Sequence, residues 1–142
     1  AAESAQSRPS QILCFLLDTL HEHILAAREA VAGNQIERRF LAIKSATEVI
    51  ADLAAGLDPA ATDAWTVQTG KLYKALTLRL LEANVCNTAR SIEESLLLLA
   101  PLRHAWHTFD AQEALRAACF EGVPGAKDSL ATAAAGVLAA AN

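Results

Sequence analysis

Apolar residues recur every three or four positions along four successive stretches of the chain, which is the spacing that gathers them on one face of an α-helix. The stretches cover about residues 10–32, 36–57, 64–83 and 89–107. Turn-forming residues separate them, beginning with Gly33-Asn34 between the first two stretches. The pattern predicts four long helices joined by short connections.

The second stretch has the most regular apolar seam. Its members are spaced 4, 3, 4, 3, 4 and 3 residues apart, and the average of 3.5 is the repeat of helices that pack side by side in bundles. They are Ile36, Phe40, Ile43, Thr47, Ile50, Ala54 and Leu57. We therefore expect an antiparallel four-helix bundle.

Residues with capping chemistry stand at several predicted helix ends. Ser10 follows Pro9 and is placed to cap the first helix, while Asp63 or Thr62 is placed to cap the third. Residues 84–88 are predicted to form the turn before the fourth helix.

The C-terminal part of the chain predicts shorter elements. Pro101 lies within the fourth helix and removes a backbone donor there, so we expect a kink. Asp110 and Glu113 have the spacing of a capping box, which predicts a short helix over 111–120. An alanine-rich helix beginning at residue 128 or 129 would follow. The predicted fold class is all-α, an antiparallel four-helix bundle with one or two short extra C-terminal helices.

The chain length of 142 residues fits a single domain. We predict a flexible N-terminal segment over 1–9, a four-helix bundle over 10–109 and a C-terminal tail with short helices over 110–142.

Composition and charge narrow the class of protein. The chain has 32 alanines and 21 leucines but only six valines and six isoleucines, which favours helices and excludes an all-β fold. Its 12 basic and 16 acidic residues give a net charge of −4 without a basic cluster. A nucleic-acid partner is therefore not expected.

The sequence also lacks the features of a membrane or secreted protein. A membrane span needs about 18–20 apolar residues, and the longest candidate, 131–141, is too short. Residues 1–10 do not have the layout of a signal peptide. Cys14, Cys86 and Cys119 are odd in number and form no CxxC pair, which is typical of a reducing compartment. We expect a soluble, cytoplasmic protein with no membrane partner.

The candidate chemistry is sparse. His21 and His23 point in different directions on a helix, whereas His104 and His107 are three residues apart and share a face, although no carboxylate or cysteine lies at matching spacing. No phosphate-binding loop, nucleophile motif or metalloprotease motif occurs. We therefore predict no catalytic residues, no metal site and no cofactor, and a protein that is not an enzyme.

The predicted helices carry more apolar residues than one buried stripe per helix requires. A surplus stripe either packs under the C-terminal helices or receives an amphipathic segment of a partner. The surplus residues are Phe15, Leu17, Leu78, Leu81, Val85, Leu97 and Leu98.

Four blocks of the chain resemble the flagellar export chaperone FliS family, in family order and at family spacing. Residues 15–20, FLLDTL, resemble the family's opening MLYDGAL segment, and residues 46–58 resemble its second apolar block, which ends in Leu-Asp. Residues 72–85 contain a Leu-Tyr pair followed by Ala-Asn-Val, and residues 98–106 resemble the LL..LR..W ending. The resemblance covers about residues 9–109.

The resemblance implies a cytoplasmic, non-enzymatic chaperone of the flagellar type III secretion apparatus. Such proteins bind the C-terminal segment of flagellin, prevent its premature polymerisation and deliver it to the export gate. The bound segment is disordered alone and becomes partly helical in an apolar groove. The resemblance is compatible with a monomer or a homodimer.

The chain departs from the family pattern near its ends. Leu17 and Thr19 replace a tyrosine and a glycine, and residues 1–7 contain no aromatic residue. Apolar residues of the tail are therefore candidates to occupy the groove themselves. These are Leu115, Phe120, Leu130, Val137 and Leu138.

The predicted partner-binding residues lie inside the matched blocks, on or beside a seam. Tyr73 offers a large apolar ring with a hydroxyl, and Asn84 is placed to cap a helix or bind a partner's backbone. Trp106 is expected to anchor the bundle instead. The full set is Leu17, Ile43, Ile50, Tyr73, Leu76, Leu80 and Asn84, of which about half are expected to be ordinary core residues, since a seam buries its aliphatic side chains.

Three alternatives remain open from the sequence. Besides a flagellin export chaperone, the sequence is compatible with a homodimeric structural bundle or a chaperone-like paralogue for another export substrate. It is also compatible with a small metal- or ligand-binding bundle that uses His104 and His107.

Overall fold

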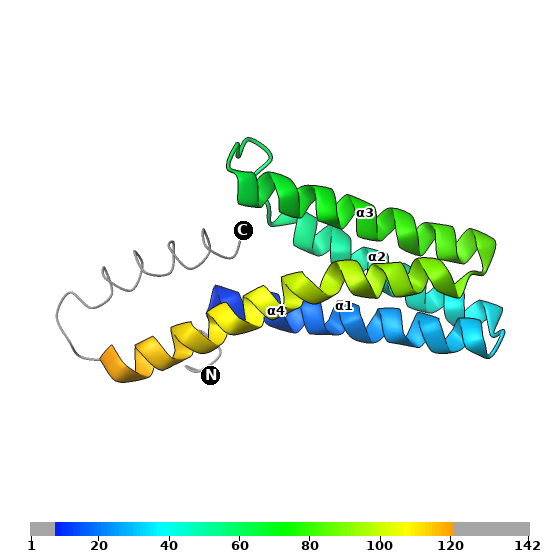
Figure 1. The fold of residues 1–142 in the computed structure, drawn as a ribbon, viewed down its shortest axis with the longest axis horizontal. Helices are drawn as coiled ribbons and strands as arrows, with labels where there is room; N and C mark the ends of the chain where they lie inside the picture. The colour runs from blue at the N-terminus through cyan, green and yellow to red at the C-terminus, as the bar shows by residue number, and fades with distance from the viewer. Residues whose placement is uncertain (1–7, 121–142) are drawn as a thin grey trace.

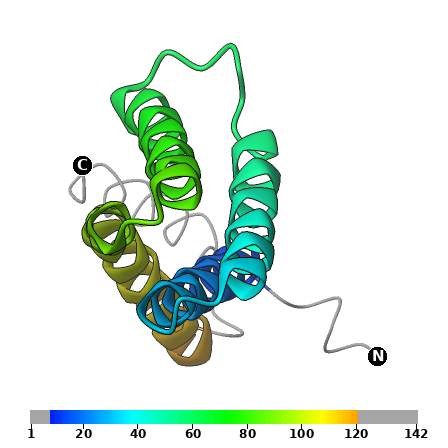
Figure 2. The same ribbon diagram turned by 90° about the vertical axis from the view of Figure 1, so that its right-hand side faces the viewer.

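The computed structural model describes residues 8–120, and all of its regular structure there is helical. Its elements are α1 (Pro9–Ala32), α2 (Ile36–Ala55), α3 (Ala64–Cys86) and α4 (Ala89–Phe120). Consecutive helices run antiparallel (Figure 1), and α1 and α3 each pack against both α2 and α4, so that the four helices form a ring (Figure 2). The predicted all-α bundle is confirmed.

One apolar core fills the centre of this ring, with contributions from every helix. Each fully buried aliphatic side chain contributes about 1.5–3 kcal/mol relative to an exposed one. Ser95 is the largest polar residue buried to the same degree, and its hydroxyl donates to the Ser91 carbonyl at 2.9 Å. The fully buried aliphatic residues of larger volume are Leu17, Leu20, Ile24, Ile43, Leu76, Leu80, Ile92 and Leu99.

The seam of α2 differs from the predicted one. Ile43 and Ile50 are buried as expected, but Ile36 and Phe40 are more than half exposed. The buried set also has 3.5-residue spacing and begins at Arg39, one position before Phe40. The predicted stripe therefore borders the buried stripe and shares only part of it, because α2 is rotated about its axis relative to the expectation.

The helix ends confirm one predicted cap and correct another. The Asp63 carboxylate accepts the Thr66 backbone N–H at 2.8 Å and caps α3. Ser10 does not cap α1, because Arg8 holds the N-cap position and Pro9 begins the helix. The Ser10 side chain is instead buried in the bundle.

Helix α4 continues through Pro101 and beyond the predicted break near residue 107. The helix expected over 111–120 is present as the last turns of α4, which changes direction along its length and projects past the starts of α1 and α3 (Figure 1). Asp110 does not cap a separate helix, because its Oδ1 accepts hydrogen bonds from Arg8 Nη2 at 3.1 Å and Ser10 Oγ at 2.8 Å. These bonds fasten α4 to the beginning of α1.

The predicted domain division is not decided by this arrangement. The boundary at residue 109 falls within α4, and the division stays a prediction. The alanine-rich helix expected from residue 128 or 129, and residues 1–7, lie outside the described residues.

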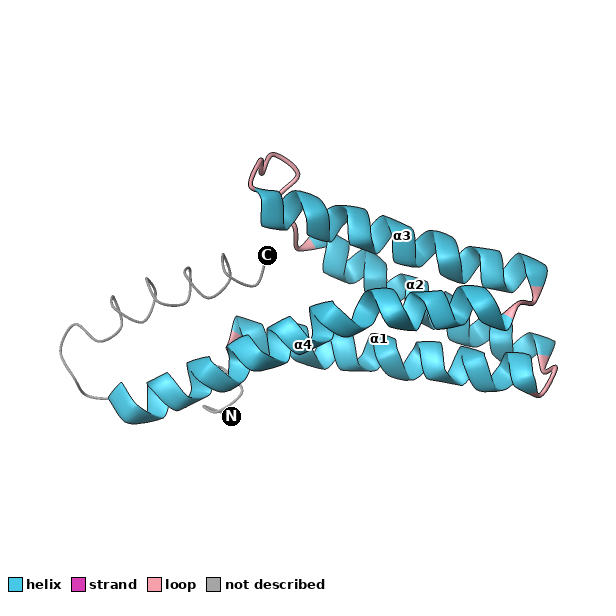
Figure 3. Ribbon diagram, viewed as in Figure 1, coloured by secondary structure: helices cyan, strands magenta, loops and turns pink. Residues whose placement is uncertain are grey.

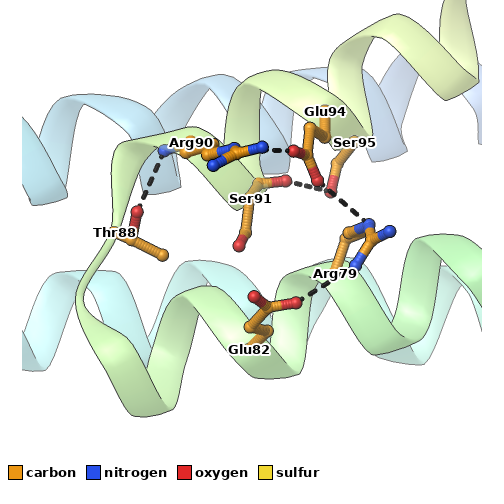
Figure 4. A network of polar contacts seen from close by, with 7 residues as sticks. All are labelled: Arg79, Glu82, Thr88, Arg90, Ser91, Glu94 and Ser95. Carbon is orange, nitrogen blue, oxygen red and sulfur yellow. Dashed lines mark hydrogen bonds and ion pairs between the residues drawn. The ribbon is translucent and has the colours of Figure 1, made fainter.

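Charged side chains also link α3 to α4 near their connection (Figure 4). Arg79 of α3 lies 3.1 Å from Glu94 of α4 and 3.2 Å from Glu82 one turn along its own helix. Arg90 approaches the same Glu94 carboxylate at 3.1 Å. Exposed pairs of this kind each contribute under about 1 kcal/mol, so this network orients the helices more than it stabilises them.

A second polar cluster joins the middle of α1 to α4. Asp18 Oδ1 accepts from Arg103 Nε at 3.1 Å and Nη2 at 2.9 Å, and lies 2.8 Å from His107 Nε2. Partial burial by itself raises the pKa of Asp18, but the hydrogen bonds and charges of His107 and Arg103 together lower it below its usual value. The ionised carboxylate therefore stabilises the folded state.

Replacing Asp18 by asparagine tests this contribution. We expect D18N to lower the free energy of unfolding by about 1 kcal/mol near neutral pH, because the cluster is partly exposed. Because the pKa of Asp18 is lowered in the folded state, its stabilising contribution is complete above the ordinary carboxyl pKa and is lost as the pH falls through the folded-state value. The stability deficit of D18N should therefore shrink in acid. Urea unfolding at neutral and acidic pH measures the difference in free energy of unfolding between D18N and the unmodified protein. The exposed Asp52, replaced in D52N, is the control, and an equal deficit in D52N would contradict the prediction.

Candidate partner-binding groove

A groove opens between α2 and α3 at the end of the bundle where residues 56–63 connect them. Its volume is about 790 Å³. Figure 2 shows the long connection that spans the two helices. The α1–α2 connection is much shorter, and residues 33–35 hold that pair closely together. The long connection leaves room for the groove between α2 and α3 at this end.

Local sequence shapes this connection. Helix α2 ends at Ala55, and the following Asp58-Pro59 pair disfavours continuation of a helix. The Asp58 carboxylate then accepts the Ala60 backbone N–H at 2.9 Å, which forms a turn. Asp63 starts α3, so the chain crosses from one wall of the groove to the other without regular structure.

Two large apolar side chains form the floor of the groove, and small residues form its walls. Ile50 of α2 and Tyr73 of α3 form its deepest part and are both nearly inaccessible to solvent. Small side chains line both helices above them, which allows the backbone of a guest helix to approach closely. These residues are Thr47, Ala51, Ala54, Gly70 and Thr77.

The rim carries charge on one side. Lys71 and Lys74 stand exposed on α3, and Asp58 lies at the connection. Val67 and Leu78 also line the groove from α3, and Leu78 is 65% exposed. A guest with an apolar face and a flanking carboxylate would match this surface.

Exposed apolar side chains continue beyond the groove along the same helix pair. Leu81 and Val85 follow Leu78 on α3, and Val85 is 85% exposed. Phe40 of α2 lies at the same level, because its neighbour Arg39 donates to Asn84, the residue before Val85. We call Phe40, Leu78, Leu81 and Val85 the α2–α3 stripe. The surplus apolar surface predicted on the third helix is thus exposed.

The other surplus residues divide between core and surface. Leu17 is fully buried and Leu98 packs partly buried against the core, so these two are not surplus. Phe15 on α1 and Leu97 on α4 are exposed, away from the α2–α3 stripe.

A buried arginine closes the narrow end of the helix pair. Arg39 is only 8% exposed, and its guanidinium donates to the side-chain oxygens of Asn84, at 3.3 Å, and Asn87. Asn87 has a left-handed backbone with φ 51° and terminates α3. The partial negative charge of this helix end favours the cation. Sequence reasoning missed Arg39, because the apolar seam of the second stretch runs through Ile36 and Phe40 and leaves Arg39 outside it.

The single tyrosine of the chain lies at the groove floor. Burial raises the pKa of Tyr73 to about 12, and no hydrogen-bond partner of its hydroxyl is found within residues 8–120. A phenol hydroxyl at this place is able to form a hydrogen bond with a guest in the groove.

The predicted partner-binding residues occupy three different environments. Ile50 and Tyr73 line the groove, and Asn84 is half-buried against Arg39. The remaining four lie in the core, and partner contact by any of the seven stays a prediction. The four core residues are Leu17, Ile43, Leu76 and Leu80. The small groove residues were not among the predicted contacts, because alanine, glycine and threonine give no distinctive signal in a helical sequence.

A smaller hollow of about 280 Å³ lies between α3 and α4 around Pro101. Trp65 borders it and meets Trp106 edge-on, with ring centroids 6.2 Å apart. Trp106 in turn meets Phe109 edge-on at 5.6 Å. Trp106 packs against the core, as expected of a residue that anchors the bundle.

Within residues 8–120 no three histidine, cysteine or acidic side chains gather as a metal site. His107 contacts Asp18 on α1, and His104 is exposed. No helix in the described part of the chain has the length and apolarity needed to cross a membrane.

The environment of Tyr73 makes a spectroscopic prediction. The chain has one tyrosine, so the phenolate absorbance change on alkaline titration reports Tyr73 alone. We expect its midpoint near pH 12 in the folded protein, above the ordinary value of about 10, because burial disfavours the phenolate. The raised pKa stabilises the fold below pH 10, and this contribution is lost as the pH rises toward 12. A midpoint near 10 while circular dichroism still shows helix would contradict the buried placement.

Comparison with known proteins places this bundle in a family. A family model described as "Flagellar protein FliS" matches residues 1–113. The flagellar secretion chaperone FliS of Salmonella typhimurium is 30% identical over 109 residues, which are 75% of this chain and 81% of the relative. The flagellar secretion chaperone FliSB of Pseudomonas aeruginosa is 26% identical over 105 residues, 74% of this chain and 83% of the relative. The match runs through all four helices and the groove between α2 and α3, and the chain belongs to the FliS family of flagellar proteins.

Proposed function

We propose that this protein is a cytoplasmic flagellar export chaperone that binds the C-terminal segment of flagellin in the α2–α3 groove. It keeps that segment from polymerising before secretion and brings it to the export gate. Family membership supports the role of a flagellar secretion chaperone. The observation that carries the binding site is the apolar groove of about 790 Å³ with the exposed α2–α3 stripe beside it.

The surface suits a guest that folds as it binds. A segment that is disordered alone must offset its ordering entropy by burying apolar area on the chaperone. The groove offers a narrow channel for one amphipathic helix, and the stripe extends the contact toward Val85. Lys71 and Lys74 on the rim would pair with carboxylates that flank the guest's apolar face.

Binding of this kind needs no chemical step. The chaperone acts by covering an apolar segment, and the free energy of binding comes mainly from the burial of apolar surface. We therefore propose a non-enzymatic role that needs neither cofactor nor metal.

Self-association is the alternative that the same stripe supports. A homodimer would bury Leu78, Leu81 and Val85 against a second copy, as in other helical interfaces. Such a dimer would be a structural bundle, and its formation would compete with guest binding. A relative serving another export substrate would use the same groove with a different guest.

Calorimetry of the full chain against the C-terminal 40–60 residues of flagellin, a span of about the size a wrapping segment needs, tests the proposal. We expect submicromolar 1:1 binding with a large negative heat-capacity change. Replacing Leu78 by serine should weaken binding about tenfold, or about 1.4 kcal/mol, because one exposed apolar contact is lost. Leu97 on α4 is 74% exposed, and its replacement in L97S is the matched control that should bind normally.

Three results would contradict the proposed site. Equal weakening by L78S and L97S would place the guest elsewhere on the bundle. No heat at any temperature would exclude flagellin as the guest. A dimer in sedimentation that L78S converts to a monomer would favour the homodimeric alternative.

A further inference from the structure

Gly70 lines the α2–α3 groove from the interior of α3. Glycine weakens a helix interior relative to alanine, because it loses more conformational freedom on folding. The backbone at Gly70 is helical, so no left-handed conformation requires a glycine there. The conformation of α3 therefore gives no reason for a glycine at this position.

The fold also has room for a larger side chain at residue 70. Outside its own helix, the one atom of residues 8–120 that a methyl group there would meet is Leu57 Cδ1, at 3.7 Å, which is an ordinary van der Waals distance. The missing methyl group therefore relieves no clash inside the bundle. It enlarges the groove, whose facing wall at Ala51 and Ala54 of α2 is also made of small residues.

The charged residues of the groove lining are placed mainly on one side. Lys71 and Lys74 line the groove from α3, whereas none of the α2 residues that line it is charged. Neither lysine forms an ion pair with another described residue, although the exposed Lys44 of α2 pairs with Glu48 at 4.0 Å. The α3 side of the groove is therefore positive and its α2 side is neutral.

We propose that Gly70 is a specificity-determining residue of the groove: the guest packs into the space left by its missing side chain, and acidic residues of the guest pair with Lys71 and Lys74 beside it. The guest is thus an amphipathic helix with carboxylates along one border of its apolar face. That this guest is flagellin rests on the proposed function, whereas the selectivity of the groove for such a helix does not.

The positions of the two lysines specify the spacing of the carboxylates. Residues three apart on a helix share a face and lie about 4.5 Å apart along its axis, as Lys71 and Lys74 do on α3. Acidic residues three or four apart on the guest repeat at about 4.5–6 Å and match this spacing. The lysines follow Gly70 by one and four residues, so the packing contact and the charge contacts involve the same part of the guest.

The two features act in different ways. Exposed ion pairs add little affinity, but a guest with a basic border would meet like charges at Lys71 and Lys74 and be repelled. At Gly70 the selection is steric, because an extra methyl group in a filled contact displaces the guest from the floor at Ile50 and Tyr73. Charge thus selects which helix binds, and the glycine determines how deeply it binds.

Replacing Gly70 by alanine in the full chain tests the role of the glycine. We expect G70A to raise the urea midpoint of unfolding, because alanine favours the helix. We expect it also to weaken binding of the C-terminal flagellin segment at least about fivefold in calorimetry, because the added methyl group overpacks the contact. A merely structural glycine would not give these opposite effects. A lower urea midpoint, or unchanged binding, would overturn the proposal.

A pair of alanine variants controls for the added bulk. Ala51→Leu enlarges the facing wall of the groove and should weaken binding as G70A does. Ala26→Leu makes the same change at an exposed site of α1 outside the groove lining and should bind normally. Equal weakening by both variants would contradict selection at the groove walls.

Two synthetic peptides test the selectivity without flagellin. Both are amphipathic helices of about 18 residues, enough to span the lining of α3 from Thr66 to Leu78. They differ only in two residues, four apart, on one border of the apolar face, which are glutamates in one peptide and lysines in the other. Fluorescence anisotropy at low salt should show at least about tenfold tighter binding of the glutamate peptide. Equal binding of the two peptides, or binding of neither, would overturn the proposal.

Charge reversal on the protein completes this test. We expect K71E/K74E to reverse the preference between the peptides, because it reverses the sign of the α3 side of the groove. The variant R38E/R90E changes the net charge equally at exposed sites outside the lining and should keep the original preference. An unchanged preference in K71E/K74E would refute the role of the two lysines.

The peptide result and the flagellin result can be separated. Binding of the glutamate peptide that G70A weakens at least about fivefold would support the selectivity of the groove whatever the flagellin segment does. If the flagellin segment then gave no heat with the unmodified chain, the proposed function would be refuted and the selectivity would stand. Equal affinity of G70A and the unmodified chain for the glutamate peptide would overturn the role of Gly70.

Discussion

A ring of four helices can bury only one stripe of each helix, and this chain carries more apolar residues than those stripes hold. The centre of the ring holds residues such as Leu20, Ile24 and Leu76, which are fully inaccessible to solvent. Leu78, Leu81 and Val85 then remain on the outside of α3, because a helix that buries one face must expose the other. Everything proposed about partners depends on this surplus, since apolar surface left in water favours whatever covers it.

The two ends of the α2–α3 pair differ because different contacts hold them. At one end Arg39 reaches from α2 to Asn84 and Asn87 and keeps the helices together. At the other end no side-chain hydrogen bond joins α2 to α3 within residues 8–120, and a long connection separates them. A bundle held closely at one end and loosely at the other provides a stable core and an accessible groove in a single small domain.

Helix α4 gives the bundle its asymmetry. Two acidic residues link it to α1: Asp18 accepts hydrogen bonds from Arg103, and Asp110 accepts them from Arg8 and Ser10. Held by these bonds, the helix continues beyond the starts of α1 and α3 (Figure 1), and its end lies on the opposite side of the bundle from the α2–α3 connection (Figure 2). The bonds that stabilise the α1–α4 contact thus join the projecting helix to the bundle at two levels of α1.

The sequence by itself determined the helices, their antiparallel order and the family, because apolar periodicity and local capping are encoded over short distances. It identified Ile50 and Tyr73, which line the groove, and the exposed residues of α3. Only the tertiary structure decided the rotation of α2 that exposes Phe40 and buries Arg39. It also decided that Asp110 accepts bonds from Arg8 and Ser10 and caps no helix. These outcomes depend on contacts between residues far apart in the chain, whose partners no local pattern specifies.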